Sequence, residues 1–89
     1  MPEIDLVIGA KAGLHARTVF LFVQEANKYG ADIRVRKEGV QVNGKSFLNM
    51  LTLGATHGSV ITIDAEGEDA GQALAALSAL VESNFGETP

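Results

Sequence analysis

The chain has 89 residues, of which 46% are hydrophobic and 20% charged, with a net charge of −4 at pH 7 and no cysteine. Its length allows one domain, and the missing cysteine excludes disulfides, thiol catalysis and cysteine–metal sites. The acidic charge balance argues against a nucleic-acid binder, and the lack of an apolar run of about 18 residues excludes a transmembrane helix.

The first part of the chain predicts a strand followed by a helix. The stretch MPEIDLVIGAK lacks the positive region and the long apolar segment of a signal peptide, so we expect a cytoplasmic protein without membrane insertion. Residues 4–8 read as a short buried strand that ends in the segment 9–13. The apolar spacing predicts a helix over residues 15–28, closed by Gly30 in the left-handed region. One face of this helix carries the apolar residues Ala16, Val19, Phe20, Val23 and Ala26.

A β-hairpin is predicted after the helix. Residues 32–37 alternate, with two aliphatic side chains on one face and two arginines on the other. The dipeptide Glu38-Gly39 predicts a two-residue turn, and residues 40–42 continue the alternation on a second strand.

The second half predicts a short helix, a strand and a long helix. Ser46 is suited to cap a helix over FLNMLTL, which ends near Gly54. After a loop, residues 60–65 alternate as a strand, and Asp69 caps the last helix. The residues expected on the inner face of that helix are Ala70, Ala73, Leu74, Leu77, Leu80 and Val81. Residues 86–89 look frayed.

The resulting element order, β-α-β-β-α-β-α, predicts the fold class. A hairpin combined with crossover connections indicates an α+β domain, with a four-stranded, mainly antiparallel sheet and three helices on one face. No repeat, linker or low-complexity segment interrupts the chain, so we predict a single domain over residues 1–89.

The segment Gly13-Leu14-His15-Ala16-Arg17 gives the clearest indication of a chemical function. His15 stands directly before the predicted helix, where backbone N–H groups lack intrahelical partners and the helix end is partly positive. A phosphate attached to the imidazole would lie in this anion site, beside the Arg17 guanidinium and the backbone N–H groups of Ala16 and Arg17. Spacing alone also fits a plainer interpretation, because a lone histidine at a helix start is most often a weak cap or a surface residue.

Two segments together resemble one known family. GLHAR with the amphipathic helix after it is similar to that family's active-site motif. NGKSFLNMLTLGATHGSVITIDAEGEDA is similar to its second helix, loop and fourth strand, in order and at the right separation. The family is HPr, the histidine-containing phosphocarriers of the bacterial phosphoenolpyruvate-dependent sugar phosphotransferase system. The resemblance covers nearly the whole chain and implies the family's open-faced β-sandwich.

The resemblance implies a phosphoryl carrier that is not itself an enzyme. Phosphorylated enzyme I would pass the phosphoryl group to Nδ1 of His15, Arg17 would stabilise it, and the A domain of a sugar permease would receive it. Phosphoryl transfer depends mainly on positioning and charge stabilisation, which a helix end and one arginine can supply. We expect a monomer that uses no cofactor.

One position departs from the family pattern. The family usually reads GLHARP, whereas this chain has Thr18 in place of the proline. Proline is tolerated in the first turn of a helix, because its missing N–H costs nothing there. Threonine restores an N–H and adds a hydroxyl, and either group could help or distort the phosphate site. We expect transfer to survive, because His15, the helix end and Arg17 remain.

Ser46 and the apolar residues near it give two further predictions. As an N-cap, Ser46 satisfies backbone N–H groups. The resemblance adds a regulatory phosphorylation there, with a kinase, a phosphatase and a transcriptional regulator as partners. A run such as FLNMLTL cannot bury every side chain in so small a domain, which predicts a docking surface beside His15. The predicted docking residues are Ala16, Phe20, Gln24, Phe47, Leu48 and Leu51.

Two other functions stay open, and two more fail on composition. A purely regulatory module acting as a corepressor partner stays open, as does a nitrogen-branch paralogue that uses the same chemistry for signalling. A hydrolase or metalloprotein fails, because the chain has no cysteine, no cluster of metal ligands and no acid–base partner near His15. We therefore predict no metal site. An RNA-binding sheet would need surface aromatics and a basic face, which one tyrosine, no tryptophan and the negative charge do not provide.

Overall fold

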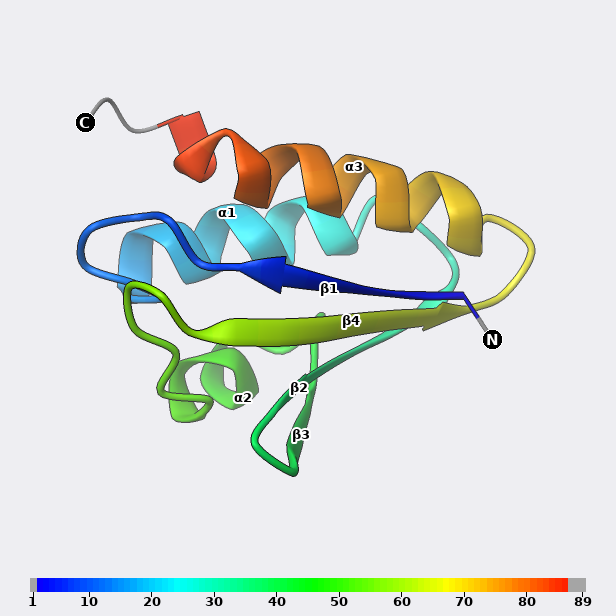
Figure 1. The fold of residues 1–89 in the computed structure, drawn as a ribbon. Coiled ribbons are helices and arrows are strands. Elements are labelled where there is room, and N and C mark those ends of the chain that lie inside the picture. Colours follow the sequence, from blue (N-terminus) through cyan, green and yellow to red (C-terminus); the bar gives the residue numbers. More distant parts are fainter. Residues whose placement is uncertain (1, 87–89) are drawn as a thin grey trace.

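A computed structural model describes residues 2–86 of the chain (Figure 1). Its elements are β1 (Glu3–Val7), α1 (Ala16–Ala26), β2 (Asp32–Lys37), β3 (Val40–Asn43), α2 (Phe47–Thr52), β4 (Val60–Glu66), α3 (Ala70–Glu82) and the short 3₁₀ helix η1 (Asn84–Gly86). The sheet has the strand order β1-β4-β2-β3, and each neighbouring pair is antiparallel. The predicted α+β class, element order and four-stranded sheet are confirmed.

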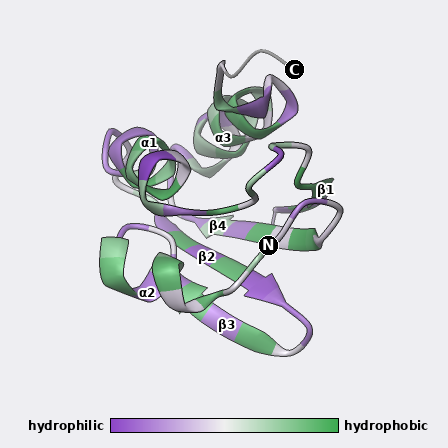
Figure 2. Ribbon diagram, turned by 90° about the vertical axis from the view of Figure 1, so that its left-hand side faces the viewer, coloured by the Kyte–Doolittle hydropathy of each residue, from purple (hydrophilic) through white to green (hydrophobic). Residues whose placement is uncertain are grey.

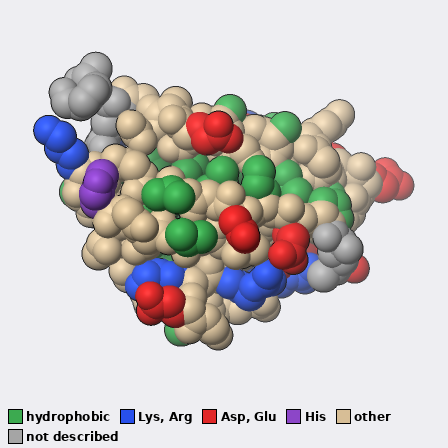
Figure 3. Space-filling view, viewed as in Figure 1, with side chains coloured by type: hydrophobic (Ala, Val, Ile, Leu, Met, Phe, Trp, Pro, Cys, Tyr) green, Lys and Arg blue, Asp and Glu red, His purple; other side chains and the backbone are tan. Residues whose placement is uncertain are grey.

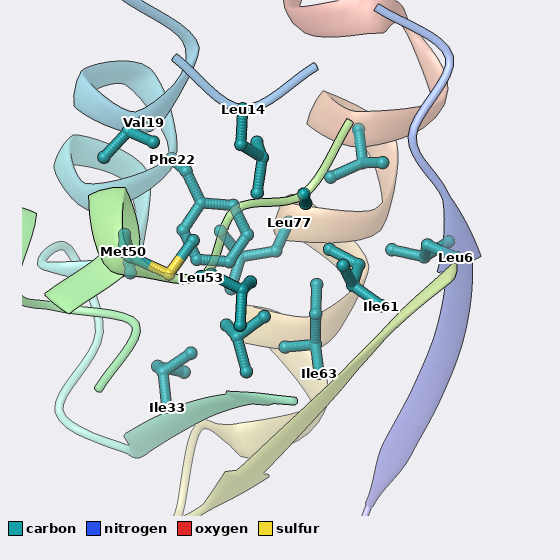
Figure 4. Close-up of a cluster of buried hydrophobic side chains, with 14 of the residues drawn as sticks. Leu6, Leu14, Val19, Phe22, Ile33, Met50, Leu53, Ile61, Ile63 and Leu77 are labelled. Atoms are coloured by element: carbon teal, nitrogen blue, oxygen red, sulfur yellow. The ribbon is translucent and has the colours of Figure 1, made fainter. Parts of the chain in front are cut away.

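The helices cover one face of the sheet. Figure 1 shows α1 and α3 side by side above the strands, and Figure 2 shows them from the end, with α2 beside β3. The core lies between these layers, where Ile61 and Ile63 of β4 belong to one cluster with Phe22 of α1 and Leu77 of α3 (Figure 4). Among residues 2–86, none of the helices has the length and apolar content that crossing a bilayer requires.

The turn dipeptide behaves as predicted. Glu38 has φ +50° and Gly39 φ +83°, so both central residues of the β2–β3 turn are left-handed. This is the backbone that a two-residue hairpin of right-handed twist needs. The turn sets the register of β2 on β3, in which Val35 pairs with Val42.

The buried face of α1 differs from the predicted one. The side chains that α1 buries are Thr18, Val19, Phe22 and Ala26. Of the predicted apolar face, Ala16 and Phe20 are exposed and Val23 is partly buried. Side chains two positions apart on a helix point about 200° apart, so the sheet cannot accept both Phe20 and Phe22. The buried face differs from the apolar spacing because it includes Thr18, a polar residue whose hydroxyl is hydrogen-bonded inside the protein.

The connection from α1 to β2 also differs from the prediction. Asn27 is the C-cap of α1, and its Nδ2 donates to the carbonyl of Val23 at 2.9 Å, so the helix ends before residue 28. Gly30 does not adopt the left-handed conformation that we predicted. Its backbone N–H donates instead to the Asp69 carboxylate at 2.9 Å, and the N–H of Ala31 donates to the other carboxylate oxygen at 2.9 Å.

Asp69 stands at the N-cap position of α3, but its side chain does not cap that helix. The carboxylate is engaged by the loop before β2, and the hydrogen bond from Gly30 is the main cause that holds the pKa of Asp69 below its usual value. The inner face of α3 is as predicted except that Leu80 is only partly buried, while Ser78 is buried with no hydrogen-bond partner for its hydroxyl. Of the predicted frayed end, Gly86 ends η1, and residues 87–89 lie outside the described part of the chain.

The second face of the sheet holds a buried carboxylate. Asp64 of β4 is 1% exposed; its Oδ1 accepts from Nε of Arg34 at 2.6 Å and its Oδ2 from Nη1 of Arg36 at 2.8 Å. These arginines lie opposite the buried aliphatic face of β2, as predicted. Figure 3 shows basic and acidic side chains next to one another along the lower side of this view, where β2 and β3 lie in Figure 1.

Candidate functional site

His15 is the N-cap of α1. Its backbone is extended, and Nδ1 of its ring accepts a hydrogen bond from the backbone N–H of Arg17 at 3.3 Å. The side chain also accepts the backbone N–H of Thr18, as in a capping box. A ring nitrogen that accepts hydrogen bonds holds a lone pair, so the proton of the neutral ring is on Nε2. The nucleophilic lone pair of His15 is therefore on Nδ1 and directed at the N-terminus of α1.

The turn before His15 is attached to the loop between α2 and β4. The side chain of Leu14 is buried, and its backbone N–H donates to the carbonyl of Ala55 at 2.9 Å. Gly13 has φ +70°, and a Cβ at this position would lie 2.6 Å from both the Ala55 carbonyl oxygen and the Cα of Thr56. Only glycine fits between these two segments. The loop after α2 thus sets where His15 stands.

Thr18, in the first turn of α1, is hydrogen-bonded to the same turn. Its side chain is fully buried, and Oγ1 accepts the backbone N–H of His15 at 3.0 Å. The hydroxyl lies 3.1 Å from the carbonyl oxygen of Gly13 and 3.2 Å from that of His15, and it donates toward these two oxygens. From the sequence the effect of Thr18 stayed open. The signal for this role is a hydrogen-bonding side chain three positions after an N-cap.

The structure brings the other predicted phosphate-site residues to the same helix end. Ala16 and Arg17 are the first two residues of α1, and both are exposed. The first intrahelical bond runs from the N–H of Val19 to the carbonyl of His15 at 2.8 Å. The N–H groups before Val19 are thus the ones that a helix leaves for other acceptors. A phosphoryl group on Nδ1 of His15 would meet the positive end of α1.

Ser46 is the N-cap of α2, as predicted. Its Oγ accepts the backbone N–H of Asn49 at 3.2 Å. The helix that it caps packs against α1, and the side chain of Asn27 at the end of α1 donates to the carbonyl of Lys45 at 3.2 Å. The hydroxyl of Ser46 therefore has a structural role that is independent of any modification.

The predicted docking residues lie mainly at the surface of α1 and α2. Those that are exposed are Ala16, Phe20, Gln24, Leu48 and Leu51. Leu48 is 73% exposed and Phe20 56% exposed, and the two belong to helices that pack against each other, α2 and α1. Phe47 is partly buried against the core, so it contributes to packing as well. Among residues 2–86, no group of three or more acidic or histidine side chains could hold a metal ion.

Comparison with known proteins assigns the family. The family model described as "PTS HPr component phosphorylation site" matches residues 2–83. The chain belongs to the HPr family. This assignment confirms the resemblance of GLHAR and of the second segment, and it places the fold among the open-faced α+β sandwiches of HPr proteins.

Individual HPr-family members are similar over nearly their whole length. The HPr-like protein Crh of Bacillus subtilis (strain 168) is 43% identical over 82 residues, which cover 92% of this chain and 96% of the relative. The phosphocarrier protein HPr of Xylella fastidiosa (strain 9a5c) is 38% identical over 87 residues, 98% of each chain. The crystal structure of HPr-C-His from Thermoanaerobacter tengcongensis matches with a TM-score of 0.97 at 44% identity and covers both chains completely.

Proposed function

We propose that this HPr-family chain carries a phosphoryl group on Nδ1 of His15, receiving it from phosphorylated enzyme I and passing it to the A domain of a sugar permease. The observation that supports this proposal is the Nδ1 lone pair directed at the N-terminus of α1. Once Nδ1 bonds to phosphorus, the N–H groups that it accepted lie beside the phosphoryl oxygens. Charge-assisted hydrogen bonds to those oxygens then replace neutral ones to the ring.

The transfer step needs no separate proton acceptor. The lone pair of Nδ1 forms the bond to phosphorus while the bond from phosphorus to the donor breaks, and the donor keeps that electron pair. The Nε2 proton stays on the ring, whose positive charge is offset by the negative phosphoryl oxygens. The guanidinium of Arg17, carried on the same turn, stabilises the charge that is spread over these oxygens. Transfer to the permease runs by the same route with His15 as the donor.

A surface site of moderate strength suits a carrier better than a catalyst. The ring of His15 is half-buried at a helix end, where a partner protein can reach it. We place the chain in the cytoplasm as a monomer, acting without a cofactor within the relay and not as an enzyme by itself. The exposed apolar residues of α1 and α2 would form the surface on which enzyme I and the permease domains dock.

Ser46 is our proposed regulatory site, with a kinase, a phosphatase and a transcriptional regulator as further partners. A phosphate on Oγ would lie at the N-terminus of α2, where the positive helix end tolerates it, and would add negative charge beside the docking surface. Ser46→Asp should therefore slow transfer from enzyme I, whereas Ser46→Ala should leave the rate unchanged. Equal rates for the two variants would contradict the regulatory proposal.

A purely regulatory module is the second candidate, because the chain is as similar to an HPr-like Crh protein as to phosphocarriers. A transfer assay with labelled phosphoenolpyruvate and enzyme I separates the two. The wild type should take up label that is acid-labile and base-stable, His15→Ala should take up none, and His57→Ala, which changes the exposed histidine of another loop, should behave as the wild type. A wild type without label would contradict the carrier and favour the regulatory module.

A further inference from the structure

Thr18 is buried in α1, and its hydroxyl also makes hydrogen bonds to the backbone before the helix. Thr18 is 0% exposed, and its hydroxyl lies within hydrogen-bond distance of three backbone groups in the turn that carries His15. Oγ1 accepts from the N–H of His15 at 3.0 Å and faces the carbonyls of Gly13 and His15 at 3.1 and 3.2 Å. A buried hydroxyl is costly unless it is hydrogen-bonded, so these contacts restrict the turn to one geometry.

The backbone N–H of Thr18 makes a second contact with His15, this time with its side chain. Its N–H is the third of α1, and the side chain of His15 accepts it together with the N–H of Arg17. A proline at this position would remove that donor, since its ring nitrogen bears no hydrogen. The ring of His15 thus faces one backbone donor more than it would with proline, and the backbone N–H of His15 donates to a side-chain hydroxyl that proline also lacks.

We propose that Thr18 is a positioning residue for phosphoryl transfer: its hydroxyl fixes the backbone of His15, and its N–H becomes an additional donor to the phosphoryl group on Nδ1. This inference rests on the proposed function of His15 as the phosphoryl acceptor. After transfer, Nδ1 no longer accepts hydrogen bonds, and the N–H of Thr18 turns to an anionic oxygen, to which hydrogen bonds are about twice as strong as neutral ones. Thr18 would therefore shift the transfer equilibrium toward the phosphorylated chain.

Three substitutions separate the two contributions of Thr18. Thr18→Ser keeps both the hydroxyl and the N–H, Thr18→Val keeps the N–H and a similar shape but loses the hydroxyl, and Thr18→Pro loses both. We expect the serine variant to behave as the wild type. The valine variant should transfer more slowly, with an equilibrium within about twofold of the wild type, because one His15 donor and two acceptors lose their partner. The proline variant should in addition lower the equilibrium constant for phosphorylation about tenfold.

The experiment measures the phosphorylated fraction by ³¹P NMR at a fixed ratio of phosphoenolpyruvate to pyruvate with enzyme I, and the transfer rate by label uptake. Thermal unfolding of each variant accompanies both measurements. A merely structural Thr18 would lower the melting temperature of the valine and proline variants but leave the equilibrium constant unchanged, and that result would overturn the inference. An equilibrium constant that falls only in the proline variant, while serine restores the wild-type rate, would support it.

A measurement on the unphosphorylated protein keeps this inference distinct from the proposed function. In ¹⁵N NMR of the neutral ring, the wild type and Thr18→Ser should show Nε2 protonated and Nδ1 as the acceptor. Thr18→Pro should show a larger share of the Nδ1-protonated form, because it removes one of the hydrogen bonds that favour the other tautomer. Tautomer populations equal in all variants would overturn the role of Thr18. A wild type that shows these populations but takes no label would instead contradict the carrier function.

Discussion

Gly13 lies two residues before His15, in a space that admits no side chain. The atoms nearest to its missing Cβ belong to the backbone of Ala55 and Thr56, so they cannot move away by a side-chain rotation. The backbone N–H of Thr56 in turn donates to Oγ of Ser59 at 3.0 Å, which stiffens the loop on that side. The position of the His15 ring is therefore coupled to a backbone contact in which no titratable group takes part.

Gly13→Ala should destabilise the fold by about 2–3 kcal/mol and slow phosphoryl transfer, because the new Cβ is strained at φ +70° and displaces the neighbouring loop. Gly39→Ala is the matched control: its φ is +83°, but nothing lies within 4 Å of the added Cβ. We expect a loss of about 1 kcal/mol there and an unchanged transfer rate. Urea unfolding and label uptake test both variants. Equal losses in the two would mean that the contact with the loop is unimportant.

At the scale of elements, β4 binds the two halves of the sheet through its side chains as well as its backbone. Arg34 of β2 pairs in register with Asp64 of β4. The Asp64 carboxylate accepts one hydrogen bond from Arg34 and one from Arg36, which both lie on β2. The side chain of Asp64 is 2% exposed, whereas those of Arg34 and Arg36 are 26% and 36% exposed. The network is thus buried at its acidic centre and open to water at its basic ends.

Asp64→Ala should destabilise the fold by about 2–3 kcal/mol, somewhat less than a fully buried pair would lose, because water can reach both arginines. Glu66→Ala, also on β4, is the control. Its carboxylate is 3.7 Å from Arg34 and 59% exposed, so its removal should cost less than about 0.5 kcal/mol. Urea unfolding at low and high salt measures both. A similar small loss in the two variants would show that burial of Asp64 contributes nothing to the ion pairs.

Asp69 joins the start of α3 to the loop before β2, and this link should depend on pH. Because the folded pKa of Asp69 is lowered, its ionised carboxylate stabilises the fold above about pH 4, and this contribution is lost as the pH falls through the lowered pKa. Asp69→Asn should have a lower free energy of unfolding than the wild type at pH 7. The difference between the two free energies should become smaller as the pH falls toward 2. Urea midpoints across this range test it, with exposed Glu68→Gln as the control. A difference that stays constant with pH would contradict the prediction.

At the scale of the whole molecule, periodicity in the sequence predicts the four strands, α1 and α2 to within about two residues, and the start of α3, because alternation and helical spacing are local properties. The short helix η1 was not predicted. The same reasoning cannot choose between Phe20 and Phe22 for the inner face of α1, since that choice depends on the sheet that the helix meets. The Asp69 carboxylate accepts from Gly30 and Ala31, 39 and 38 positions away, and no local window of the sequence can show these contacts. His15 was found because its chemistry is local, whereas its support by the loop after α2 is not.

The exposed apolar surface is a property of the whole molecule, and it predicts how partners dock. Leu48→Asp should leave the free energy of unfolding within about 0.5 kcal/mol of the wild type, since the side chain is 73% exposed. It should raise the KM for enzyme I about tenfold, because a charge replaces an apolar contact. Val40→Asp, 53% exposed in the β2–β3 hairpin, should leave the KM unchanged. The same KM in both variants would place the docking surface elsewhere.

The strand order has a consequence for the chain during synthesis. β1 leaves the ribosome before the other three strands, yet its neighbour in the sheet is β4, which ends at Glu66. The backbone N–H of Leu14 likewise bonds to the carbonyl of Ala55, which is synthesised much later. Such long-range contacts form only after the later segment exists. A nascent chain that stops before β4 therefore contains the histidine without the surroundings that direct its lone pair. Competence for the proposed transfer should therefore arise late in translation, and a fragment that ends before β4 should take up no label from enzyme I.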